Sequence, residues 1–109
     1  GQSVRLQSYD VGVYSFAITN ESTKLFLVNN NEYPINVTKI VINDNVCGVG
    51  NVSIGGGSRG SFVCTQANSS DFGATVRWPL HVEYVNMLTG TTRVQNDSDF
   101  VLMGRVGRS

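Results

Sequence analysis

The stretch LFLVNNNEYPINVTKIVI, residues 25–42, decides the fold class of this chain. Two short apolar runs flank three consecutive asparagines at 29–31, a typical turn signal, and neither run shows the 3.6-residue periodicity of an amphipathic helix. In the second run the apolar side chains alternate in one phase up to Val37 and in the opposite phase from Ile40. This change of phase predicts a β-bulge, or a strand that crosses from one sheet to the other. The stretch therefore predicts two consecutive β-strands.

Two-residue alternation continues on both sides of this stretch. It is present over residues 13–18, 74–78 and 80–86, and further strands are expected over 91–95 and 100–104. The total is about seven to nine short strands with turn signals at intervals of about eight to twelve residues. This spacing predicts an all-β, immunoglobulin-like antiparallel sandwich.

Pro79 interrupts the alternation between two of these segments. Because proline has no backbone N–H to donate, the segment is expected to be an edge strand or to be kinked at that point. Trp78, the only tryptophan of the chain, is expected to anchor the core.

Length and composition narrow the class of protein. The chain has 109 residues, so we expect a single domain over residues 1–109 with one core. Eight basic residues balance eight acidic ones, and this neutral surface offers no electrostatic footprint for nucleic acid or anionic lipid. Apolar runs reach only about four residues, far below the roughly 20 of a membrane-spanning helix, and no signal peptide is recognisable. The start at Gly1 is therefore interpreted as a mature or trimmed end.

Asparagine, serine and threonine replace the missing charge. The chain contains 11 Asn and 19 Ser plus Thr, and several of these form the N-x-[ST] acceptor pattern for N-linked sugars. Chance would produce about two such matches, so five are an excess. Five glycosylation sites on a secreted protein are therefore predicted, at Asn20, Asn36, Asn51, Asn68 and Asn96.

Two cysteines, Cys47 and Cys64, lie beside strand-like sequence with a glycine-rich turn between them. In a chain with these extracellular features, a disulfide between them is the leading interpretation. Closure of a loop of this size should stabilise the fold by about 3 kcal/mol. The alternative is a pair of free buried thiols in a cytosolic protein. We expect the disulfide and an extracellular or cell-surface location.

Catalytic machinery is not expected, and no motif requires a cofactor. The run over residues 55–60 is rich in glycine, but no lysine and helix follow it as in a phosphate-binding loop, so a flexible hairpin loop is expected. His81 is the only histidine, and the chain contains no G-x-S-x-G nucleophile elbow. His81 is therefore interpreted as a solvent-facing strand residue, with Glu83 expected to form a cross-strand ion pair with Arg77 or Arg93.

Oxygen-rich turns are the only candidates for metal binding. Asp97 and Asp99, and separately the segment 43–45, place carboxylate and amide oxygens in turns, and calcium prefers such ligands. Neither stretch has the EF-hand spacing, and Asp or Asn in turns usually bonds nearby backbone. We therefore expect no metal, with Asp97 and Asp99 as weak calcium candidates.

The first eight residues precede the core segments. Residues 3–7 alternate as a strand would, and residues 1–8 are expected to be an edge strand of this domain or an exchange strand that adds to a neighbouring subunit. The first of these interpretations is favoured.

Residues 25–40, with their Asn-rich turn and Pro-Ile-Asn-Val-Thr strand, resemble a segment of archaeal pilins and archaellum-related surface proteins. The glycine turn at 53–58, the strand and turn over 84–90, and the placement of Cys47 and Cys64 are similar as well. The resemblance spans residues 24–106. It implies a glycosylated domain of a cell-surface filament. The long apolar N-terminal helix through which such pilins assemble is not in this sequence, which leaves the mode of assembly open.

Three functions follow as expectations. The first is a structural, non-enzymatic extracellular domain of a pilin-like filament that associates with itself through strand edges or sheet faces. The second is a pseudoperiplasmic anchor that binds the surface layer. The third is a carbohydrate-binding module, for which the aromatic candidates are Tyr9, Tyr33 and Tyr84, the last of them expected to point inward.

Overall fold

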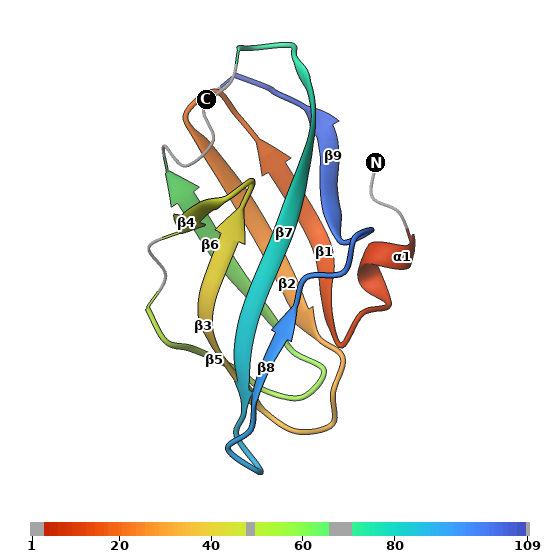
Figure 1. The fold of residues 1–109 in the computed structure, drawn as a ribbon, viewed down its shortest axis with the longest axis vertical. Helices are drawn as coiled ribbons and strands as arrows, with labels where there is room; N and C mark the ends of the chain where they lie inside the picture. The colour runs from red at the N-terminus through yellow and green to blue at the C-terminus, as the bar shows by residue number, and fades with distance from the viewer. Residues whose placement is uncertain (1–3, 48–49, 66–70, 109) are drawn as a thin grey trace.

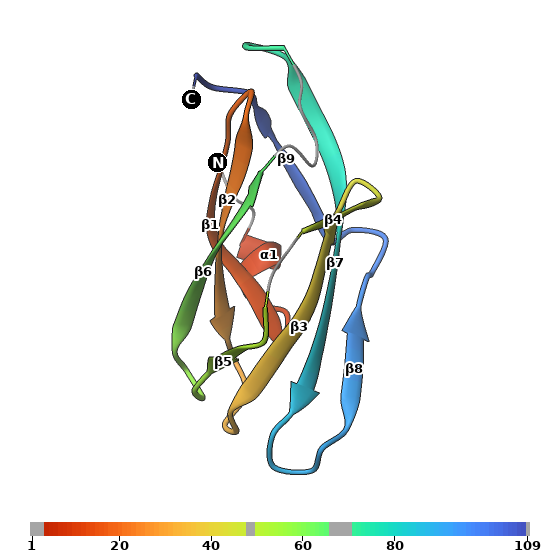
Figure 2. The ribbon, with the colours of Figure 1, turned by 90° about the vertical axis from the view of Figure 1, so that its left-hand side faces the viewer.

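Apolar side chains at alternate positions bring the chain together as two facing sheets (Figures 1 and 2). The computed structural model describes residues 4–47, 50–65 and 71–108. Within these ranges the elements are, in chain order, α1 (Val4–Gln7), β1 (Val11–Ile18), β2 (Ser22–Asn29), β3 (Ile35–Ile42), β4 (Asn45–Cys47), β5 (Val52–Ile54), β6 (Arg59–Thr65), β7 (Thr75–Asn86), β8 (Thr92–Gln95) and β9 (Val101–Arg105).

The strands form two antiparallel sheets. One has three strands in the order β1-β2-β6, and the other has six, with β4-β3-β7-β8 as its main path, β5 paired with β3 and β9 paired with β7. Figure 2 shows the three-stranded sheet on the left and β3, β7 and β8 on the right. The chain passes between the sheets from β2 to β3, from β5 to β6 and from β6 to β7. The predicted immunoglobulin-like β-sandwich is confirmed.

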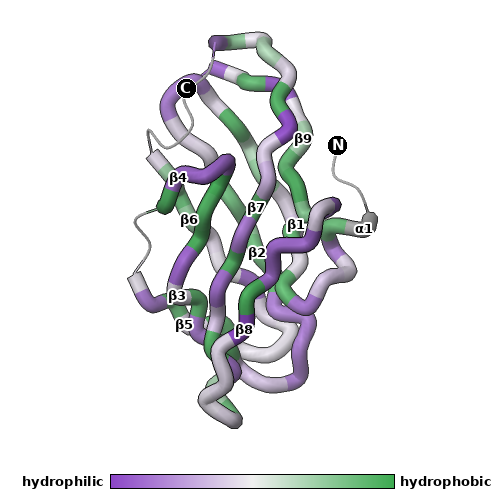
Figure 3. The backbone as a smooth tube through the Cα atoms, in the orientation of Figure 1, coloured by the Kyte–Doolittle hydropathy of each residue, from purple (hydrophilic) through white to green (hydrophobic). Residues whose placement is uncertain are grey.

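The core lies between the two sheets. Along β7, buried and partly exposed residues alternate from Trp78 to Asn86, and Trp78 belongs to the core cluster, with only 7% of its surface exposed. In β2 the buried Leu25 and Leu27 point toward the same core. Figure 3 shows that hydrophobic and hydrophilic residues follow one another within single strands, rather than separating into whole apolar elements. One inward face per sheet is the pattern expected of a sandwich.

The predicted change of phase in β3 is a β-bulge. The pairing of β3 with β7 shifts register between Val37 and Lys39, so that one extra residue, Thr38, lies in β3. As a result Val37 and Ile40 are both fully buried although they are three positions apart. The bulge therefore keeps both apolar segments of this strand on the core side of one sheet.

Pro79 lies inside the long strand β7, at the point where this strand changes partners. Residues 80–86 of β7 pair with β3, whereas residues 75–79 pair with β9. On the β3 side the chain has already turned away at Asn43 and Asp44, whose positive φ values of 49° and 68° form the tight turn into β4. The β3–β7 ladder ends with one bond, from the N–H of Asn43 to the carbonyl oxygen of Pro79 at 2.9 Å, so the proline lies where the ladder stops and its missing donor is tolerated.

The predicted turn at residues 29–31 is confirmed, and its first asparagine is fully buried. The Asn29 side-chain amide donates to the carbonyl oxygens of Tyr33 at 2.8 Å, Ile54 at 3.0 Å and Gly55 at 3.2 Å. Its Oδ1 accepts from the backbone N–H of Asn31 at 2.9 Å. Asn29 thereby joins the β2–β3 and β5–β6 connections.

The strand predicted over residues 3–7 is wrong, because Val4–Gln7 form a single helical turn, α1. Leu6 in this turn is buried in the core cluster. The turn ends where Asn30 donates to the carbonyl oxygens of Gln7 and Tyr9, both at 2.7 Å. Alternation over only five residues cannot distinguish a strand from one turn of helix. No helix of the described residues is long and apolar enough to cross a membrane.

Candidate functional site

The predicted disulfide between Cys47 and Cys64 is confirmed. Cys47 ends β4 in the six-stranded sheet and Cys64 lies in β6 of the three-stranded sheet, with 5.1 Å between their Cα atoms. Both residues are buried in the core cluster. The bond therefore joins the two sheets. A disulfide in a domain of this size is compatible with an extracellular location.

Four of the five predicted glycosylation sites lie among the described residues. Asn20 is in the β1–β2 turn, Asn51 precedes β5 and Asn96 follows β8, and all three are exposed. Asn36 is in β3 between Ser53 and Val85 of the neighbouring strands and is partly exposed. Asn68 lies outside the described residues. Asn36, Asn51 and Asn96 thus belong to the six-stranded sheet or the loops beside it.

The outer surface of the three-stranded sheet is apolar and basic. We call it the β1-β2-β6 face. Its larger outward side chains are Tyr14, Lys24, Phe26, Val28, Arg59 and Val63, and small or hydroxyl residues such as Ser15 and Ser61 lie between them. Tyr14 is 42% exposed and Val63 is 54% exposed, and the Arg59 guanidinium lies 3.6 Å from the centre of the Tyr14 ring. The sequences of β1, β2 and β6 contain no acidic residue and no glycosylation acceptor. The face can therefore meet another surface without burying a carboxylate or a sugar.

The outer surface of the six-stranded sheet carries an ionic cluster instead. The Nε2 atom of His81 lies 2.8 Å from Oε2 of Glu83, and Nζ of Lys39 lies 3.9 Å from the same oxygen. The predicted pairing of Glu83 with Arg77 or Arg93 is wrong. In the pairing of β7 with β8, Val94 lies opposite Glu83, and Arg93 lies opposite Tyr84, whose side chain faces inward. Arg93 and Glu83 are therefore not cross-strand neighbours.

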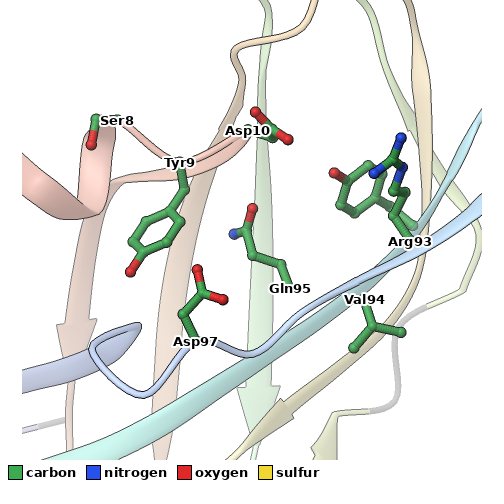
Figure 4. Close-up of a pocket in the computed structure, with 8 residues that line it drawn as sticks. Ser8, Tyr9, Asp10, Arg93, Val94, Gln95 and Asp97 are labelled. Atoms are coloured by element: carbon green, nitrogen blue, oxygen red, sulfur yellow. The ribbon is translucent and has the colours of Figure 1, made fainter.

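A polar pocket of about 340 Å³ opens where the segment before β1 approaches β8 (Figure 4). In Figure 4, Tyr9 and Asp97 are turned toward each other at one end of the pocket, and Arg93 lies at the other. We call this site the polar pocket, and the residues that line it are Ser8, Tyr9, Asp10, Tyr84, Arg93, Val94, Gln95 and Asp97.

Gln95 fixes one wall of the polar pocket, because its side-chain amide forms two hydrogen bonds with the backbone of Val11, as a neighbouring strand would. Its Oε1 accepts from the backbone N–H of Val11 at 3.1 Å, and its Nε2 donates to the carbonyl oxygen of Val11 at 2.7 Å. Both bonds are buried, and Gln95 is only 8% exposed. This pair connects β8 of one sheet with β1 of the other.

The phenol of Tyr84 has a raised pKa. Burial raises the pKa of its phenol above the ordinary value of 10.0, the charges of Asp10 and Tyr33 raise it further, and Arg93 lowers it. Tyr84, Asp10 and Arg93 all line the polar pocket. Tyr84 points inward, as expected, yet its hydroxyl end reaches this site.

The two weak calcium candidates have separate surroundings. The Asp99 carboxylate accepts a hydrogen bond from the Tyr9 hydroxyl, whereas Asp97 lines the polar pocket. No group of three or more His, Cys, Asp or Glu side chains within the described ranges is arranged to hold a metal ion. The structure therefore adds no support for a metal site at these residues.

The glycine-rich run over residues 55–60 is a turn, but the expected hairpin is wrong. It joins β5 to β6, which lie in different sheets and do not pair with each other. The N–H of Ser58 donates to the carbonyl oxygen of Gly55 at 3.0 Å, and Gly57 has a φ of 75° that favours glycine. The run is a crossing turn between the sheets.

Sequence reasoning found only part of the polar pocket. It named Tyr9, Tyr84, Arg93 and Asp97, but for different purposes, and it missed Asp10 and Gln95. Val11 and Gln95 lie 84 positions apart in the sequence, so their hydrogen bonds leave no local signal. The packing of β8 against β1 creates this site.

The fold and the surfaces define the class: a disulfide-linked, immunoglobulin-like β-sandwich with two unlike outer surfaces. Comparison with known proteins finds no family model that matches the chain and no curated protein with significant sequence similarity. A functional proposal must therefore stand on the chain's own surfaces.

Proposed function

We propose that this chain is a structural, non-enzymatic extracellular domain of a cell-surface filament protein of the archaeal pilin-like kind. Copies of the chain associate through the β1-β2-β6 face, and sugars on the other side keep the filament soluble. The observation that carries the proposal is that the strands of the β1-β2-β6 face combine exposed apolar and basic side chains with no carboxylate and no acceptor asparagine. The resemblance of residues 24–106 to archaeal surface proteins supports the class of assembly.

The β1-β2-β6 face has the composition of a contact surface. Tyr14 and Val63 expose about half of their area, and Phe26 and Val28 on the central strand are partly exposed between them. Removal of such apolar area from water contributes about 25 cal/mol of favourable free energy per Å². Lys24 and Arg59 supply positive charge without a carboxylate on the same strands. Association through this face therefore buries apolar surface at the centre and leaves long basic side chains at the rim.

The edges of the three-stranded sheet favour open-ended growth. Among the described strands β6 pairs only with β2, so its other edge is open to pairing within the sheet plane. β6 contains neither lysine nor proline, the residues with which soluble proteins commonly block an edge. A contact that joins an edge or face of one copy to a different patch of the next does not close on itself, and it generates a filament.

Two acceptor asparagines, Asn36 and Asn96, lie on the side of the six-stranded sheet, whereas Asn20 lies in the β1–β2 turn at one end of the β1-β2-β6 face. Asn36 is near the middle of the six-stranded sheet, and Asn96 lies beside His81 on the same side. A glycan at either position would obstruct contacts through that sheet. The non-enzymatic assignment is supported by the commitment of both cysteines to the disulfide and of His81 to Glu83.

Light scattering over a concentration series tests the contact surface. We expect the wild-type chain to grow in mass with concentration, and Val63→Glu to weaken association by at least about tenfold, because a buried charge costs more than about 1.4 kcal/mol. The introduced carboxylate would face Lys24 across the strand pair, so the monomer should remain folded. Val46→Glu is the matched control, since Val46 is an equally exposed strand valine of the other sheet.

Two results would contradict the proposal. If Val63→Glu and Val46→Glu weaken self-association equally, the β1-β2-β6 face is not the contact surface. A mass that stops at a dimer would exclude filament growth and favour the anchor that binds the surface layer. Mass spectrometry of native material should also find sugars on the acceptor asparagines, and unmodified asparagines would remove the shielding half of the proposal.

A further inference from the structure

The polar pocket is held open by the fold itself. Gln95 and Val11 exchange two buried hydrogen bonds, so the distance between β8 and the start of β1 is fixed by backbone-like pairing. On the other side, the Tyr9 ring packs at a tilt of 59° against the buried Phe100, with 4.7 Å between ring centres, and the Tyr9 hydroxyl donates to the Asp99 carboxylate. Preformed sites lose little conformational entropy when they bind a ligand.

A polar group from the core reaches this pocket. Tyr84 is only 2% exposed, and within the described part of the chain its hydroxyl has no hydrogen-bond partner. Every fully buried side-chain nitrogen or oxygen of the described residues does have one. The Tyr84 hydroxyl must therefore open to solvent, and Tyr84 lines the polar pocket. A phenol hydroxyl there can both donate and accept.

The other pocket side chains complete a mixed set of donors and acceptors. The carboxylates of Asp10 and Asp97 only accept, and the Arg93 guanidinium only donates. Among the described residues, these three side chains make no hydrogen bond or ion pair with other side chains. Val94, which is 51% exposed, adds an apolar wall beside them. The pocket can thus bond several polar groups of one ligand at once.

The chemistry of the ligand follows from this set. Two carboxylates against one guanidinium disfavour an anion. Arg93 disfavours a bare divalent cation, and no cluster of three acidic or metal-binding side chains is present in the described ranges. A neutral saccharide has adjacent hydroxyls that donate to carboxylates and accept from a guanidinium, and C–H groups that pack against valine. A volume of about 340 Å³ lies at the small end of ligand sites, which span roughly 300–1,000 Å³.

We propose that the polar pocket binds one neutral saccharide unit, whose hydroxyls bond to Asp10, Asp97, Arg93 and the Tyr84 hydroxyl. This site is independent of the β1-β2-β6 face. It gives the domain a means of adhering to a glycan on another molecule. It does not depend on whether the chain forms a filament.

Titration followed by NMR tests the site, with the unglycosylated chain and three probes: methyl α-glucopyranoside, methyl α-mannopyranoside and N-acetylglucosamine. We expect at least one probe to bind with a Kd of about 1–10 mM and to shift the resonances of residues 8–10 and 93–97, which corresponds to about 3–4 kcal/mol. Glucuronate should bind about tenfold more weakly because its carboxylate meets Asp10 and Asp97.

Two variants show whether the named groups bind the sugar. Tyr84→Phe removes one hydroxyl and leaves the ring, so the affinity should fall about fivefold while thermal stability stays unchanged. Asp97→Asn should lower the affinity about tenfold, because a hydrogen bond to a charged group is lost. Asp71→Asn, at an exposed carboxylate outside the pocket, is the matched control and should bind as the wild type does.

Several outcomes would overturn this assignment. They are no shift with any probe at about 100 mM, a Kd unaffected by both variants, or tighter binding of glucuronate than of the neutral sugars. Displacement of a bound sugar by calcium chloride or spermidine at equal concentration would show that the pocket is a cation site instead. Val63→Glu should leave the sugar titration unchanged, so failure of the proposed contact face and failure of this site are separate results.

Discussion

The two sheets of this sandwich share one core but have very different outer surfaces. The β1-β2-β6 face is apolar and basic, with Tyr14 and Val63 half exposed and no acceptor asparagine in its strands. The six-stranded sheet carries Asn36, the cluster around Glu83 and, at its β8 edge, the polar pocket. The contrast shows that the need to bury apolar side chains constrains only the inward-facing positions of each strand. The outward-facing positions are free to differ between the two sheets.

Two links hold these unlike surfaces at a fixed separation, and they lie at different edges. The disulfide joins β4 to β6, and the Gln95–Val11 pair joins β8 to β1. The first is covalent and near the β1-β2-β6 face, and the second is a pair of hydrogen bonds beside the polar pocket. Removing each in turn should affect the two surfaces unequally.

Loss of the disulfide is expected to have the largest effect on the free energy of unfolding. It tests whether both surfaces depend on the same link between the sheets. The double variant Cys47→Ala and Cys64→Ala should lose about 3 kcal/mol of unfolding free energy. For a domain of this size that loss lowers the Tm by roughly 15 °C. Calorimetry measures the shift, and addition of dithiothreitol to the double variant should produce no further change. A double variant as stable as the wild type would contradict the role of this link.

A smaller and more local effect is expected from Gln95→Ala. The variant leaves the N–H and carbonyl of Val11 without their buried partners, which should cost about 2 kcal/mol. Urea unfolding measures this loss, and Thr92→Ala on the same strand is the control because Thr92 is exposed. We also expect sugar binding at the polar pocket to weaken in Gln95→Ala while self-association persists. Equal loss of both properties would show that the two surfaces are not independent.

The smallest effect concerns the ionisation of Tyr84. Its pKa is raised in the folded state, so above pH 10 the folded chain holds more protons at this site than the unfolded chain. The resulting stability is fully present below pH 10 and is lost as the pH rises through the folded-state pKa. Tyr84→Phe should therefore unfold less steeply above pH 10 than the wild type, as measured by circular dichroism. If the wild type and Tyr84→Phe lose stability equally above pH 10, the pKa of the Tyr84 phenol is not raised by its burial.

Part of this arrangement could be read from single segments of sequence. The alternation of β7, the turn after Asn29 and the phase change between Val37 and Ile40 depend on neighbours within about ten residues. The cysteine pair was likewise predicted from composition and spacing. Each of these features has a local cause, and each is confirmed by the structure.

Other features could not be read in this way. The segment 4–7 is a helical turn because Leu6 enters the core and Asn30 bonds Gln7 from another loop. Glu83 meets Lys39 and His81 because the register of β3, β7 and β8 places Val94, and not Arg93, opposite it. A shift of one residue in that register would have reversed the outcome.

Local sequence patterns are enough to predict the fold class, the disulfide and which residues of most strands face the core, because burial of apolar side chains acts at a fixed period along each strand. Which outward residues share a surface, and which distant groups meet at the polar pocket, depends on how the two sheets are assembled. Those neighbours are set by sheet order and register, where residues as far apart as Val11 and Gln95 come into contact. No local pattern encodes such contacts, because their free energy is gained only after both sheets have formed.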